Sequence, residues 1–268
     1  MLTRLALLFF LVTLISSPIK AQTTAPVRDP QALTAIASSL KALTGGTAVN
    51  DVTLQAAASY VAGSDEETGT AALTATSRQE SLLQLNLTSG SRQEVRSGLL
   101  GAWVGPDSTT HCMATFNCRT DASWFFPALT LESLSSDSTI AVTYVGLDSS
   151  KGTALVHVRA ARVQWADSAV AAAEILRVGT MDIYFDPQSF LPLVLDFNEH
   201  ADNNPNTDIT VEIEFGNFQN MNGGLVPFHI QKLLRGSLTL DLTVTSVVLN
   251  SGVPDSEFAL ACVPGGQL

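Results

Sequence analysis

Two stretches of alternating sequence decide the fold: residues 209–215 read ITVEIEF, and residues 238–245 read LTLDLTVT. In both, apolar side chains take every second position, and Thr, Glu or Asp fill the positions between. Successive side chains of a strand point to opposite faces, so each strand has one buried face and one face in water. Burial on one side is typical of antiparallel sheets.

The same alternation extends over most of the chain. Further alternating or apolar runs occupy residues 52–60, 71–75, 83–87, 140–144, 155–163, 181–185 and 193–197. Turn signals such as Asp186-Pro187 and Asn222-Gly223 separate them at hairpin-like intervals. No long linker marks a domain boundary. The sequence therefore predicts a mainly β (α+β) single domain over residues 22–268, with a few helices across one face of an antiparallel sheet.

Three segments carry helix signals. In the first, Asp29 is suited to cap a helix, Pro30 fits its first turn, and Gly45 marks its stop. The other two predicted helices are Ser123–Ser135 and Asp167–Arg177, the latter capped by Asp167 or Ser168. The acidic, Asn-rich segment 198–208 is predicted to be an exposed loop.

The N-terminus has the pattern of a secretory signal peptide over residues 1–21. A basic start that includes Arg4 precedes the apolar run 5–15, and Ala21 is the expected cleavage position. The run is shorter than the ~20 residues that span a bilayer; an uncleaved anchor is the alternative. No later apolar stretch reaches spanning length. The mature chain is thus expected in the periplasm or outside the cell, and not as an integral membrane protein.

The composition is acidic, with a formal net charge of −11. Removal of Arg4 and Lys20 with the leader makes the mature chain more negative still. Such a surface repels phosphate backbones and anionic lipid headgroups. Nucleic acid is therefore not an expected partner, and electrostatic docking on membranes is disfavoured.

Three cysteines follow the leader. Cys112 and Cys118 lie close together in HCMATFNC, and an exported protein meets an oxidising compartment, so these two are predicted to form a disulfide. The alternative takes His111 with the same two cysteines as metal ligands, although the spacing matches no established zinc site. Cys262 is left over, and its state is open.

No catalytic motif is present, so neither an enzyme activity nor a cofactor nor a metal is predicted. His157 is assigned to the polar face of a strand and His229 to ordinary strand packing. His200 belongs to the cluster EHAD, which could hold a divalent cation but arises easily by chance in an acidic loop.

The aromatic triplet Trp124-Phe125-Phe126 is the most suggestive local feature. Such a cluster could line a pocket or form part of a lid; a plain core anchor is the favoured alternative. The same two interpretations apply to Leu99 and Trp103, which follow a turn containing glycine.

Residues 181–258 resemble the C-terminal half of the LolA-like family of exported lipoprotein and lipid carriers. The chain there reads MDIYFDPQSFLPLVLDF, then ITVEIEFGNFQNMNGGLVPFHI, then LTLDLTVTSVVLNSGVPDSEF. The resemblance implies a strongly curved sheet, a half-barrel, with helices on its concave face and an apolar cavity that holds acyl chains. The matched positions shape turns and strands, so no functional residue is carried over.

Three functions follow as hypotheses. The first is an exported carrier or binding protein for a hydrophobic ligand, a lipid or an acyl chain. Its cavity is expected to be lined by Leu83, Leu85, Leu99, Trp103, Trp124, Phe125, Phe126 and Leu240. The second is a non-catalytic envelope module with a packed core that docks a protein partner. The third, a hydrolase or metal enzyme, requires His111, His200 or His229 to converge with carboxylates.

Overall fold

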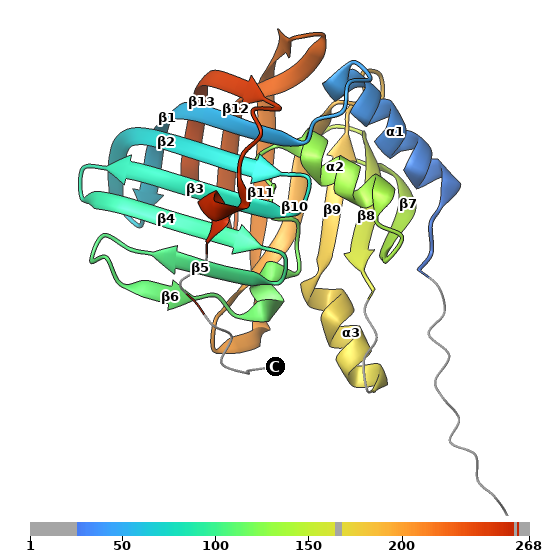
Figure 1. Cartoon of the computed structure of the whole chain (residues 1–268). Helices are drawn as coiled ribbons and strands as arrows, with labels where there is room; N and C mark the ends of the chain where they lie inside the picture. The colour runs from blue at the N-terminus through green and yellow to red at the C-terminus, as the bar shows by residue number, and fades with distance from the viewer. Residues whose placement is uncertain (1–25, 164–167, 260–261, 263–268) are drawn as a thin grey trace, which may run out of the picture.

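The computed structural model describes residues 26–163, 168–259 and 262; the predicted signal peptide lies outside these residues. In the described part, thirteen strands form one antiparallel sheet in the order β6-β5-β4-β3-β2-β1-β13-β12-β11-β10-β9-β8-β7 (Figure 1). The sheet curves but stays open, with β6 and β7 as its edges. The predicted fold class, a curved antiparallel half-barrel with helices, is confirmed.

The strands follow two meanders. The first comprises β1 (Asp51–Ala62), β2 (Asp65–Thr76), β3 (Glu80–Leu87), β4 (Gly90–Ser97), β5 (Leu100–Val104) and β6 (Thr110–Cys112). The second comprises β7 (Ile140–Asp148), β8 (Leu155–Arg162), β9 (Thr180–Phe185), β10 (Pro192–Ala201), β11 (Asn204–Met221), β12 (Gly224–Leu234) and β13 (Ser237–Leu249). They join where β1 pairs with β13, so the first and last strands lie side by side.

All three predicted helices are present. In α1 (Pro30–Thr44) the Asp29 carboxylate accepts a hydrogen bond from the Gln31 N–H, and Gly45 ends the helix at φ +61°. The helix α3 (Ala169–Val178) is capped by the Ser168 side chain. The helix α2 (Pro127–Ser136) begins later than expected, because a residue before proline disfavours helical backbone and Phe126 has non-helical backbone angles.

The helices α1 and α2 pack against each other in the hollow of the sheet (Figure 1). Ile36, Phe125, Leu129 and Leu131 are almost completely buried between the helices and the strands. The Arg28 guanidinium fixes the end of α2, where it donates hydrogen bonds to the carbonyl oxygens of residues 134, 135, 137 and 140. The carbonyls of residues 134 and 135 belong to the last turn of α2 and lack a partner within the helix, so Arg28 supplies a missing cap.

The expected loop over residues 198–208 is wrong. The strands β10 and β11 continue through this segment and leave a turn of two residues at its tip. Strand pairing satisfies the backbone there, and His200 is only 4% exposed. Among the described residues, no helix is long and apolar enough to cross a bilayer.

Candidate ligand-binding cavity

A cavity of about 330 Å³ lies on the concave face beside the strands β3, β4, β5, β12 and β13. Its apolar wall comprises Tyr60, Leu83, Leu85, Trp103, Leu234 and Leu240. Ligand pockets in proteins measure ~300–1,000 Å³, so this space suits one small hydrophobic ligand. We call it the apolar chamber.

A second hollow of about 160 Å³, the polar chamber, adjoins the first. It is lined by Glu94, Arg96, Trp103, Met113, Asn117, Thr120, Trp124, Phe197, Glu199 and Asp202. Glu94 and Trp103 line both chambers and face each other across β4 and β5.

Gly101 allows the chain to fold over β5 at this place. A Cβ atom on Gly101 would lie 2.6 Å from the Met113 Sδ and 3.0 Å from the Cys118 Sγ. The segment that leads into the short helix η1 (Thr115–Cys118) therefore rests directly on the strand.

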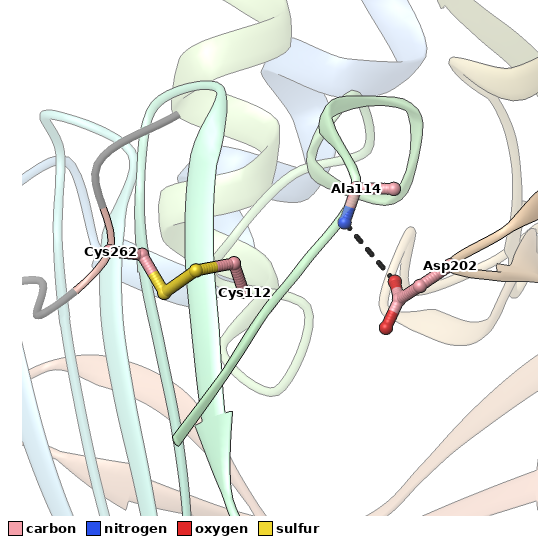
Figure 2. Close-up of a disulfide and its surroundings, with 4 residues drawn as sticks. All are labelled: Cys112, Ala114, Asp202 and Cys262. Carbon is pink, nitrogen blue, oxygen red and sulfur yellow. Dashed lines mark hydrogen bonds between the residues drawn. A yellow bond between two sulfur atoms is a disulfide. The ribbon is translucent and has the colours of Figure 1, made fainter. Parts of the chain in front are cut away.

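The η1 segment is tied to the β10–β11 hairpin. The Asn117 side chain donates to the His200 carbonyl oxygen (2.8 Å) and accepts from the His200 N–H (2.9 Å). The Asp202 carboxylate accepts from the Ala114 N–H (3.1 Å; Figure 2). These bonds connect the edge of the first meander to the second and form one wall of the polar chamber.

The cations of both chambers have protein partners. Arg92 pairs with Glu67 (3.2 Å) and lies over the Tyr60 ring. Lys232 pairs with Glu199 (2.6 Å). Burial of the ammonium group lowers the pKa of Lys232, but the carboxylates of Glu199 and Glu94 more than offset this and leave that pKa above its usual value.

Arg96 has a structural role on the same face. It is only 3% exposed and donates to the carbonyl oxygens of Thr120 (2.6 Å) and Asp121 (3.3 Å). It thereby holds the segment that enters α2 against β4.

The predicted Cys112–Cys118 disulfide is wrong: Cys112 pairs with Cys262 (Figure 2). Cys112 lies opposite Ala102, which belongs to a small apolar cluster that also packs against Cys262. Cys118 packs over Gly101 instead, and neighbouring strand residues point to opposite faces. The two cysteines of HCMATFNC are therefore separated by the sheet.

Cys118 is a buried free thiol. Burial raises the pKa of this thiol above its usual value, which favours the protonated form.

The structure separates the predicted site residues into three groups. Leu83, Leu85, Trp103 and Leu240 line the apolar chamber, and Trp124 lines the polar chamber. Phe125 and Phe126 are core residues, 1% and 2% exposed, as the core-anchor alternative requires. Leu99 lies in the β4–β5 turn and is absent from both linings. Ligand binding by the lining residues stays a prediction.

The charged lining residues of β4 were not among the predicted site residues. This strand reads GSRQEVRS, and alternation places Arg92, Glu94 and Arg96 on the concave face. An inward face that is polar has no hydrophobic period, so the usual signal was absent.

The histidines do not converge. His111 stacks on Trp103, and His229 pairs with Asp241. His200 pairs with Asp208 (2.9 Å). No group of three or more potential metal ligands exists among the described residues.

His157 lies on the polar face of β8, as predicted, but it is buried between Asp148 and Asp182. Beside it is a polar hollow of about 410 Å³. Lys151 joins Asp196 (2.7 Å) and Glu212 there, and burial raises the pKa of Asp196. The Lys151 ammonium thus balances the charge of the two carboxylates.

The sequence matches no protein-family model and no curated protein. Several solved structures share the fold, and three of them are given below. A domain described as outer membrane lipoprotein-sorting, from Vibrio parahaemolyticus, is 11% identical, with a TM-score of 0.53 over 85% of this chain and 96% of its own. A LolA superfamily protein from Nitrosomonas europaea is 10% identical, with a TM-score of 0.54 over 85% and 97%.

The third is a DUF1329 family protein from Desulfovibrio piger, 9% identical, with a TM-score of 0.53 over 88% of this chain and 98% of its own. The sheet and its inner helices thus define an open antiparallel half-barrel. More narrowly, the protein has a LolA-like fold, as the resemblance implied. At these identities the similarity concerns the fold.

Proposed function

We propose that the protein is an exported carrier or binding protein for a hydrophobic ligand, a lipid or an acyl chain, held in the apolar chamber. The observation that carries this proposal is the cavity of about 330 Å³ that Leu83, Leu85, Leu234 and Leu240 leave unfilled. A module with a fully packed core would have no such space.

Two further observations support the proposal. The Cys112–Cys262 disulfide suits an oxidising compartment outside the cytoplasm, in agreement with the expected signal peptide. The fold is shared with a domain described as lipoprotein-sorting. A single domain over residues 22–268, free after leader cleavage, is part of the proposal.

The energetics fit reversible binding. Burial of about ten methylene groups contributes ~0.8 kcal/mol each, or roughly 8 kcal/mol in total. Association costs of ~4–15 kcal/mol offset most of this. One chain therefore binds with modest net affinity, which permits release, and no catalytic group is required.

Native mass spectrometry tests the proposal on mature protein purified from the compartment to which it is exported, with organic extraction in parallel. We expect a bound mass that extraction identifies as a lipid. A ligand-free mass that does not change after incubation with phospholipids and fatty acids would reject the proposal and favour the protein-docking module.

A further inference from the structure

Glu94 stands at the junction of the two chambers. With Trp103 it lines both of them, and its side chain is half-buried. Across the described part of the chain, no hydrogen bond or ion pair joins its carboxylate to another residue. Its charge helps to raise the pKa of Lys232, while its oxygens stay open to an N–H or O–H donor from a ligand.

The neighbouring cations leave no equivalent position for an anion. Arg92 is engaged by Glu67, Lys232 by Glu199, and Arg96 by two backbone carbonyls. Arg92 Nη1 and Arg96 Nε lack hydrogen-bond partners, but both atoms are covered and a ligand cannot reach them.

The charge of the polar chamber acts in the same direction. Glu94, Glu199 and Asp202 line it, against Arg96 and the Lys232 that pairs with Glu199. A negatively charged group would meet the unpaired Glu94 carboxylate at close range, whereas an N–H or O–H donor would form a charge-assisted hydrogen bond. The net charge of the chain also disfavours anions.

The two volumes limit the size of each end of the ligand. The apolar chamber accommodates a single chain. The polar chamber, about 160 Å³, has the volume of roughly five water molecules at ~30 Å³ each, so it admits a polar end of glycerol or amine size.

We infer that the ligand is a single-chain amphiphile whose small polar end carries a hydrogen-bond donor and no negative charge, and that Glu94 accepts this hydrogen bond. The inference rests on the proposed function and names the ligand class for the same cavity.

Three probes with the same saturated chain test the inference: monolauroylglycerol, dodecylamine and laurate. Their affinities for the mature protein are measured by calorimetric titration at neutral pH, below the concentration at which each probe forms micelles. We expect laurate to bind more weakly than the other two by roughly tenfold or more, because it alone lacks a donor and places a second carboxylate beside Glu94.

The variant Glu94→Gln keeps the shape of the side chain and an acceptor oxygen but removes the charge. We expect it to weaken dodecylamine binding by roughly tenfold, to strengthen laurate binding, and to change monolauroylglycerol binding little. The matched control, Glu257→Gln, removes one charge from an exposed residue of η2 (Asp255–Phe258) and should leave all three affinities unchanged.

The outcomes separate this inference from the proposed function. If laurate binds as tightly as the other probes, or if Glu94→Gln leaves the order of affinities unchanged, the inference is overturned and the carrier function stands. If none of the three probes binds, the carrier function is rejected and the inference with it. A thermal unfolding midpoint for each variant confirms that the fold is intact.

Discussion

Alternating strands form both halves of the concave face, but helices and large side chains fill only one of them. Beneath α1 and α2, large side chains such as Ile36 and Phe125 are almost fully buried. Beside β3–β5, Leu83 is half-buried and Trp103 is 39% exposed. The apolar chamber is therefore the part of the hollow that the two helices do not fill.

Different interactions stabilise the half beneath α1 and α2 (the helix-covered half) and the half beside β3–β5 (the cavity half). Packing and the Arg28 hydrogen bonds fix the helix-covered half. In the cavity half, the covalent Cys112–Cys262 bond ties the edge strand to the C-terminal segment. Side chains beside an unfilled cavity have fewer packing partners than core side chains. The disulfide therefore adds stability that burial does not supply in this half.

The largest expected effect is in the helix-covered half. Phe125→Ala should reduce the free energy of unfolding by about 3–5 kcal/mol, because it leaves a void in a packed core. Leu83→Ala, in the cavity half, should cost about 1 kcal/mol, since its side chain already borders empty space. Urea unfolding of both variants measures the contrast, and equal losses would contradict it.

The disulfide should come next. Replacement of Cys112 and Cys262 by Ser removes a cross-link with a sequence separation of 150 residues. We expect a loss of about 2–5 kcal/mol in the free energy of unfolding. Hydrogen exchange should rise first in β5 and β6. Cys118→Ala, which leaves the cross-link in place, is the control, and a uniform rise over all strands would argue against a local role.

Arg28→Ala should destabilise the helix-covered half by roughly 2 kcal/mol, because carbonyls at the end of α2 lose a charged donor. The measurement is the chemical unfolding midpoint. Arg28→Lys should restore part of the loss. No change in either variant would show that water replaces the guanidinium without cost.

The smallest effect concerns Asp51, at the seam between the two meanders. Burial raises the pKa of Asp51, but hydrogen bonds from Ser251 and Gly252 more than offset this and hold that pKa below its usual value. Its contribution to stability is therefore present above the unfolded pKa of ~3.9 and is lost as pH falls through the folded pKa. In Asp51→Asn, the free energy of unfolding should fall less steeply as the pH is lowered. An unchanged slope would exclude this role.

Local signals predicted much of the fold. Alternation marked the antiparallel sheet, and Asp29, Pro30 and Gly45 bounded the first helix. Local signals do not show which face of the sheet a residue occupies, so features that depend on the face could not be predicted from them. The Cys112–Cys262 pair could be predicted only by knowing that Cys112 and Cys118 lie on opposite faces of the sheet.

The sequence indicated apolar and aromatic lining residues of the candidate site but not the charged ones. Leu83, Leu85 and Leu240 followed from alternation, and they line the apolar chamber. Glu94 could not be predicted, because the sequence does not distinguish a charged residue on the concave face from one in water. The position of Glu94 in the lining is evident only in the structure, where this residue lies opposite Trp103 in the pairing of β4 with β5.

A variant that fills the apolar chamber shows whether the uncovered half of the concave face binds a ligand. Native mass spectrometry of the exported wild-type protein and Leu83→Trp, purified in parallel, would compare bound lipid in each. We expect a lipid mass in the wild type and little or none in Leu83→Trp, with similar unfolding midpoints. Equal lipid occupancy in both proteins would contradict this expectation.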